Sequence, residues 1–281
     1  MKWGAWMAVL VLAAAACRGA DDSGVSVSDF ASVDEGRYEV LAQGGHQMAY
    51  EVNLFMNEML RHYEEYFGNQ TFKADARVIV FDDSADFHNY ASNAFGVPHP
   101  WLAGYCQWKT DASGHRVCEL VVHNNGNVWP TLAHEGFHQF IVYELGGQLP
   151  VWLNEGLAQY FETSAFLGSS FRVGQINRGR MLEAQALVRN HQAPTLAQLV
   201  RMDPAAFYAD PNADYPMSWA FTFYLITSGN PSVQSEFRSY LQDVRWGGDS
   251  LKNAQERMAQ DGDRWQSDFE DFVLHLRTWV D

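Results

Sequence analysis

The stretch NVWPTLAHEGFHQFIVYELGGQLPVWLNEGLAQYFE, residues 127–162, decides the fold because it predicts two helices joined by a tight turn. Gly146 and Gly147 are suited to ending the first helix, and Pro150 is suited to starting the second. The turn brings the chain back on itself. We therefore expect two antiparallel helices whose facing sides can deliver side chains to one point.

The first of these helices carries HEGFH, an HExxH motif made of His134, Glu135 and His138. Residues i and i+4 lie on one helix face, so both imidazoles can bind a single ion. Glu135 is rotated by about 100° and can reach a metal-bound water without being a ligand. Catalytic zinc takes three protein ligands and keeps one position open. We expect Glu155, on the second helix, to be the third ligand of one Zn²⁺ ion.

Two further segments carry a resemblance to a known family. WLNEGLAQY, residues 152–160, resembles the zinc-ligand helix of gluzincins, especially that of the aminopeptidase N family. YPMSWAFTFYL, residues 215–225, resembles the gluzincin helix that begins with the tyrosine stabilising the transition state. Residues 38–281 more loosely resemble small uncharacterised bacterial peptidases of the MA clan. The resemblance implies a thermolysin-like zincin fold, a peptide or protein substrate, Glu135 as general base and Tyr215 as oxyanion stabiliser.

The sequence also departs from that family. The Gly-x-Met-Glu-Asn strand that binds a free amine in aminopeptidases is absent, so aminopeptidase specificity is not implied. Gln159 stands where thermolysin-like enzymes place a carboxylate that orients the first zinc histidine. Glu162 is a candidate partner for a zinc histidine, or else a solvated surface residue.

His123 could line the cleft. Trp101 and Tyr105 could contact substrate, with loop packing as the alternative.

The chain as a whole predicts an α+β fold, with a small N-terminal mixed sheet followed by a mostly helical part. We expect strands at 38–42 and 76–81, and a hairpin formed by 102–108 and 117–123. Amphipathic spacing and helix-start signals predict the helices. Their expected ranges are 46–68, 84–91, 128–143, 151–162, 175–188, 215–227, 233–244, 251–259 and 264–278.

The N-terminal segment predicts export. Residues 1–16 have one early lysine, an apolar run and small residues, as in a secretory signal peptide. Cys17 directly follows Ala14, Ala15 and Ala16 and resembles the lipidated cysteine of bacterial lipoproteins, although ordinary secretion with a free thiol is the alternative. We expect 17–36 to be a flexible tether and 37–281 the folded domain. Cys106 and Cys118 are then an even pair, for which we expect a disulfide.

Composition limits the class of partner and leaves three functions open. The 281 residues carry a formal charge of −15, which disfavours binding to nucleic acid. We expect contact with a membrane only through a lipid anchor on Cys17. The first functional hypothesis is a zinc metallopeptidase. A non-catalytic zinc-stabilised surface protein and a hydrolase of a non-peptide substrate are the alternatives.

Overall fold

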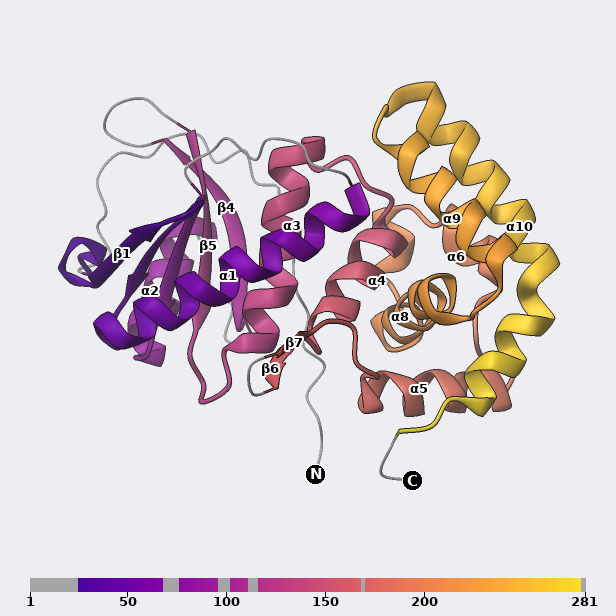
Figure 1. Cartoon of the computed structure of the whole chain (residues 1–281), viewed down its shortest axis with the longest axis horizontal. Helices are drawn as coiled ribbons and strands as arrows, with labels where there is room; N and C mark the ends of the chain where they lie inside the picture. Colours follow the sequence, from indigo (N-terminus) through magenta and orange to yellow (C-terminus); the bar gives the residue numbers. More distant parts are fainter. Residues whose placement is uncertain (1–24, 68–75, 96–101, 111–115, 168–169, 279–281) are drawn as a thin grey trace. The chain divides into compact units, whose positions relative to one another are not determined.

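The computed structural model describes residues 25–67, 76–95, 102–110, 116–167 and 170–278 (Figure 1). The predicted signal peptide, Cys17 and Trp101 lie outside these residues. The chain divides after Gly147 into two compact units, and Tyr66 and Phe67 belong with the second unit. Each unit is described separately.

The first unit contains a sheet, three α-helices and a short 3-10 helix in its described residues. Its elements are η1 (Val27–Asp29), β1 (Ala31–Glu35), β2 (Tyr38–Ala42), α1 (His46–Phe67), β3 (Ala76–Phe81), α2 (Ser84–Phe95), β4 (Gly104–Thr110), β5 (Arg116–His123) and α3 (Trp129–Leu145). The strand order is β1-β2-β3-β5-β4. The pairs β2–β3 and β3–β5 are parallel, whereas β1 and β4 pair antiparallel with their neighbours. The predicted mixed sheet is therefore confirmed, with β4 at one end of the order.

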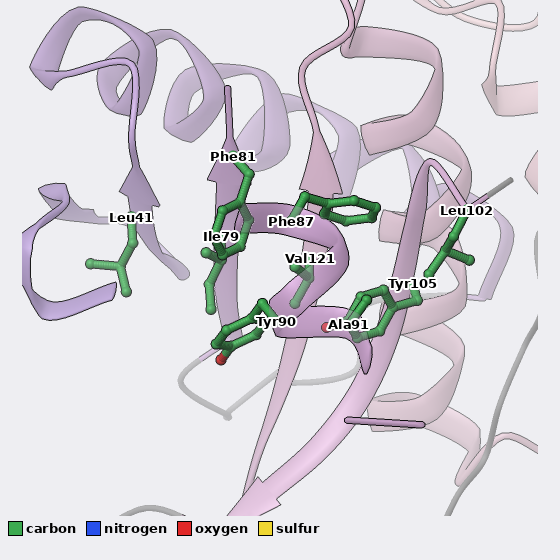
Figure 2. Packing of buried hydrophobic residues seen from close by; sticks show 9 residues of the cluster. All are labelled: Leu41, Ile79, Phe81, Phe87, Tyr90, Ala91, Leu102, Tyr105 and Val121. Carbon is green, nitrogen blue, oxygen red and sulfur yellow. The ribbon is translucent and has the colours of Figure 1, made fainter. Parts of the chain in front are cut away.

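One face of this sheet packs against α2 through aromatic and aliphatic side chains (Figure 2). Phe87 of α2 contacts the rings of Phe81 and Tyr105, at centroid distances of 6.1 and 6.2 Å. Side chains alternate between the two faces of a strand, so the neighbours of Tyr105 in β4 point away from α2. Those neighbours, Gly104 and Cys106, face α3.

Polar contacts fix α3 on its own face of the sheet. The Gln139 side-chain amide donates to the backbone carbonyls of Arg77, at 3.0 Å, and Cys118, at 2.7 Å. Tyr63 of α1 donates its hydroxyl to the Ala133 carbonyl at 2.8 Å. Buried polar groups need such partners, so these bonds determine where α3 can sit. They hold the two turns that carry the HExxH motif.

The segment 17–36, predicted to be a tether, is partly structured. Residues 31–35 form β1, which pairs with β2 from Ala31–Ala42 to Glu35–Tyr38. Val33 is buried, and the Phe30 ring lies against Phe81 at 5.2 Å. The tether prediction rested on the high Ser, Asp and Gly content of the segment and gave too little weight to its few large apolar residues. A strand at the end of a sheet needs only one apolar face, so a few such residues suffice.

The structure also differs from the predicted disulfide, because Cys106 and Cys118 are both free, buried thiols. Cys106 is opposite Leu120 in the β4–β5 ladder, so the two cysteines occupy diagonal positions. Diagonal Cα atoms are usually about 7–8 Å apart, whereas disulfides favour roughly 5.5–6 Å. The Cys106 thiol instead donates to the Glu135 carbonyl at 3.1 Å. Burial, followed by the hydrogen bond with Cys118, raises the pKa of Cys106 well above its usual value.

The second unit is mostly helical, as predicted. Its elements after Gly147 are α4 (Val151–Phe161), β6 (Ala165–Leu167), β7 (Ser170–Arg172), α5 (Arg178–Arg189), α6 (Leu196–Arg201), α7 (Pro204–Phe207), α8 (Pro211–Thr227), α9 (Pro231–Val244) and α10 (Gly248–His275). The β6–β7 hairpin and the short helices α6 and α7 were not predicted. Together the two units give an α+β chain whose sheet precedes its helical part.

The two helices predicted at 251–259 and 264–278 form the single helix α10. Gly262 lies in the gap between the two predicted ranges. A Cβ atom added there would lie 2.9 Å from Leu196 Cβ, so this glycine instead permits close packing of α10 against α6.

None of the helices in the described part of the chain combines the length and apolar character needed to span a bilayer.

Candidate metal centre

The helix α3 presents His134 and His138 on one buried face. It has Pro130 in its first turn and ends at Gly146, whose left-handed φ of 59° favours glycine. The Nε2 atoms of the two histidines lie 3.1 Å apart, and the side chains are 5% and 0% exposed, respectively. Two imidazole nitrogens this close together converge on one point, as the i, i+4 spacing predicts.

Glu155 lies in the middle of α4 and is completely buried. Its Oε1 atom accepts a hydrogen bond from the Tyr208 hydroxyl at 2.8 Å. The helix begins after Pro150, whose extended backbone accommodates the turn, and packs closely on α8. A buried carboxylate is costly unless hydrogen bonds or a cation compensate its charge.

His134, His138 and Glu155 form a buried group that could hold a metal ion. Each offers one ligand atom, and these atoms lie within 4.8 Å of one another. Two imidazole nitrogens and one carboxylate oxygen are a donor set that suits zinc. The burial of an acidic side chain in this group also favours a cation there, so the residues fit the predicted ion.

Glu135 is buried beside the strand β4. A Cβ atom added to Gly104 would lie 3.2 Å from Glu135 Cγ and 2.8 Å from Thr131 Cγ2. Only a residue without a side chain leaves this space open, so Gly104 lets the strand approach the glutamate closely. Glu135 is therefore next to the last strand in the order of the sheet.

Tyr215 lies in the second turn of α8 and is 2% exposed. Its ring contacts Phe207 at 5.3 Å, Arg180 lies over its face at 5.6 Å, and the Tyr208 ring is 6.3 Å away. The predicted helix thus starts earlier, at Pro211, and Tyr215 is not its first residue. The contacts bring Tyr215 close to the tyrosine that binds Glu155.

Gln159 connects α4 with α8. Its side-chain amide donates to the Glu155 carbonyl at 3.0 Å and to Ser218 Oγ at 3.2 Å. Ser218 in turn donates to the Tyr215 carbonyl at 2.9 Å. The Gln159 amide thus joins the backbones that carry Glu155 and Tyr215.

Three other candidates from the sequence lie in ordinary surroundings. His123 stacks on Phe87 at 5.6 Å, on the sheet face covered by α2, and this is the face opposite α3. Tyr105 is fully buried in the same apolar cluster, as the packing alternative predicted. Glu162 accepts a hydrogen bond from Asn177 at 3.4 Å.

Tyr208 is the site residue that sequence analysis missed. It belongs to the segment between two predicted helices, and no motif marks it. The only available signal was a tyrosine seven residues before Tyr215, preceded by an aspartate and a proline that favour a short helix.

Comparison with known proteins and protein families gives two findings for this chain. No curated protein matches the chain. Residues 129–245, less than half of the chain, are similar to a family described as Protein of unknown function (DUF1570). The match begins at the first residue of α3 and includes both histidines of the group, Glu155, Tyr208 and Tyr215.

Proposed function

We propose that this protein is a zinc metallopeptidase with a gluzincin-type, thermolysin-like catalytic fold. The observation that carries the proposal is the buried group of His134, His138 and Glu155, with ligand atoms within 4.8 Å of one another. The HExxH motif adds a fourth residue, Glu135, that a purely structural zinc site does not need. These three ligands would hold one Zn²⁺ ion.

The chain supplies a proton carrier and an oxyanion donor for peptide hydrolysis. Zinc in such a site lowers the pKa of a water and polarises a carbonyl. Glu135 takes the proton of the attacking water and passes it to the leaving amine. Tyr215 donates a hydrogen bond to the carbonyl oxygen of the substrate as negative charge develops there.

The strand β4 is suited to binding an extended peptide. It is the last strand in the order of the sheet, and Gly104 brings it close to Glu135. An exposed strand edge offers backbone groups that can pair with a substrate strand. A peptide that pairs with residues 102–106 would run past the general base, which favours a peptide over a compact non-peptide substrate.

The sequence of residues 1–17 supports export of this activity. A signal peptide followed by a lipidated Cys17 would anchor the enzyme at a cell envelope, whereas cleavage without lipidation would release it. The N-terminal residue and mass of the mature protein distinguish these two cases.

The first prediction tests metal binding and chemistry together. The parent protein should contain about one zinc ion per chain and cleave unfolded casein. Glu135→Gln should keep the zinc and lose nearly all turnover, because an amide cannot accept the proton of the water. Tyr215→Phe should keep the zinc and lower kcat by roughly 10²–10³ with little change in KM. Metal analysis and casein cleavage measure both effects.

The control is Glu256→Gln, which changes an exposed glutamate of α10 and should alter neither quantity. Zinc without casein cleavage in the parent would favour a binding protein or a hydrolase of another substrate class. Full activity of Tyr215→Phe would remove Tyr215 from the mechanism while leaving the other roles intact.

A further inference from the structure

The hydrogen bond between Tyr208 and Glu155 has no role in the mechanism above. The Tyr208 hydroxyl donates to Glu155 Oε1 at 2.8 Å, across 53 positions of sequence. The carboxylate is completely buried, whereas the tyrosine is partly exposed. A hydrogen bond to a buried charged acceptor is among the stronger polar contacts in proteins, and it fixes the direction of the carboxylate.

The segment around Tyr208 is built to hold the phenol in place. Asp203 caps the short helix α7 by accepting a hydrogen bond from the Ala206 amide at 2.8 Å. Phe207 is fully buried and meets the Tyr208 ring edge-on, at 5.4 Å and 90°. It also contacts the Tyr215 ring at 5.3 Å. The phenol of Tyr208 is thus part of a packed aromatic group and does not lie on a free loop.

We propose that Tyr208 is a positioning residue that holds Glu155 in the orientation required of a metal ligand. The proposal rests on the metal site of the proposed function. A carboxylate has two oxygens, so a bond from Tyr208 to one of them leaves the other for a cation. Hydrogen-bonding partners of metal ligands orient those ligands, and their loss typically weakens metal affinity by about 10–100-fold.

The test is the variant Tyr208→Phe, which keeps the ring and removes only the hydroxyl. The metal-free protein is titrated with Zn²⁺ in competition with a chromophoric chelator. We expect the variant to bind zinc about 10–100-fold more weakly than the parent. With Co²⁺ as a spectroscopic probe, we expect weaker or shifted visible bands at saturation, because the carboxylate is held less firmly. Thermal unfolding of the metal-free variant should match that of the metal-free parent.

Tyr240→Phe is the matched control. Tyr240 is a buried tyrosine of α9 whose ring lies 5.8 Å from that of Trp152, so it packs against α4 without binding Glu155. Its variant should bind zinc as tightly as the parent. Equal weakening in both variants would mean that any lost phenol loosens the unit, and this would overturn the proposal.

The remaining outcomes separate this inference from the proposed function. Unchanged zinc affinity in Tyr208→Phe would overturn the positioning role, and a lower kcat with unchanged affinity would place Tyr208 on the substrate instead. A parent that binds zinc but does not cleave protein would contradict the proposed peptidase while leaving the Tyr208 result valid. A parent that binds no zinc would overturn both.

Discussion

At the scale of single residues, Asp214 of α8 is a buried carboxyl group with an unusual proton affinity. Its side chain is 3% exposed, and burial, followed by the charge of Asp210, raises its pKa from 3.8 to about 6. The folded state therefore holds this proton over a pH range in which the unfolded state has released it. Stability from this group is lost as the pH rises from about 4 to 6, because a folded pKa above the unfolded value favours folding only at low pH.

The second prediction follows from the direction of this pKa shift. Asp214→Asn should raise the free energy of unfolding at pH 7.5, by as much as about 3 kcal/mol, since the amide carries no charge to bury. At pH 4 most of the gain should disappear, because the folded state holds the proton and the unfolded state is about half protonated. Urea denaturation at the two pH values measures the difference. Asp210→Asn, which removes only the secondary cause, should give a smaller gain, and an equal gain at both pH values would contradict the assignment.

The residues with periodic spacing could be predicted, and those with only tertiary contacts could not. His134 and His138 follow from a helix period and a known spacing, and their nitrogens do converge. Glu155 follows from a helix, a turn and a second helix, all within one short stretch. Tyr208 reaches Glu155 across 53 positions, and no local pattern encodes that contact.

At the scale of elements, each motif helix has a glycine after its motif glutamate, and the two glycines meet different neighbours. A Cβ atom on Gly156 of α4 would overlap Thr222 Oγ1 and lie 2.6 Å from the Ser218 carbonyl oxygen of α8. A Cβ atom on Gly136 of α3 would lie 2.7 Å from Met56 Cε, the end of a flexible side chain. The backbone of α8 cannot move out of the way as the flexible end of the Met56 side chain can.

The third prediction compares the two substitutions. Gly156→Ala should destabilise the protein by about 1–3 kcal/mol, the usual cost of overpacking. Gly136→Ala should change stability by no more than about 1 kcal/mol, because alanine's helix propensity offsets a small side-chain shift. Chemical denaturation of both variants measures this. A negligible cost for Gly156→Ala would mean that α4 and α8 can separate without penalty.

The contrast between local sequence signals and contacts with other elements explains which elements the sequence predicts well. The strand 76–81 was predicted with its observed limits because its apolar run is bounded by aspartates and its side chains are buried. The prediction divided α10 on either side of Gly262, a glycine that permits packing against α6 and does not end the helix. The strand β1 and the helices α6 and α7 are short, and their stability comes from neighbours outside their own sequence.

At the scale of the whole molecule, the group of residues that could hold a metal ion exists only in the folded chain. His134, His138 and Glu155 are all buried, and their ligand atoms are brought within 4.8 Å of one another by folding. An unfolded chain has no such fixed arrangement and binds an ion more weakly. A ligand that prefers the folded state stabilises it in proportion to the logarithm of its free concentration.

The final prediction uses this linkage, without reference to catalysis. Free Zn²⁺ at about 100 times its Kd should stabilise the metal-free protein by about 2.7 kcal/mol, which corresponds to a rise in Tm of roughly 5–10 °C. His138→Ala should lose most of this rise because it removes one of three ligands. His275→Ala, which changes an exposed histidine paired with Asp271 on α10, should keep it. Calorimetric scans with and without zinc provide the measurement. A rise of equal size in both variants would show that zinc stabilises the chain at another site. If zinc does not raise the Tm of the parent protein, the proposed metal ligands are wrong, and the proposed peptidase is wrong with them.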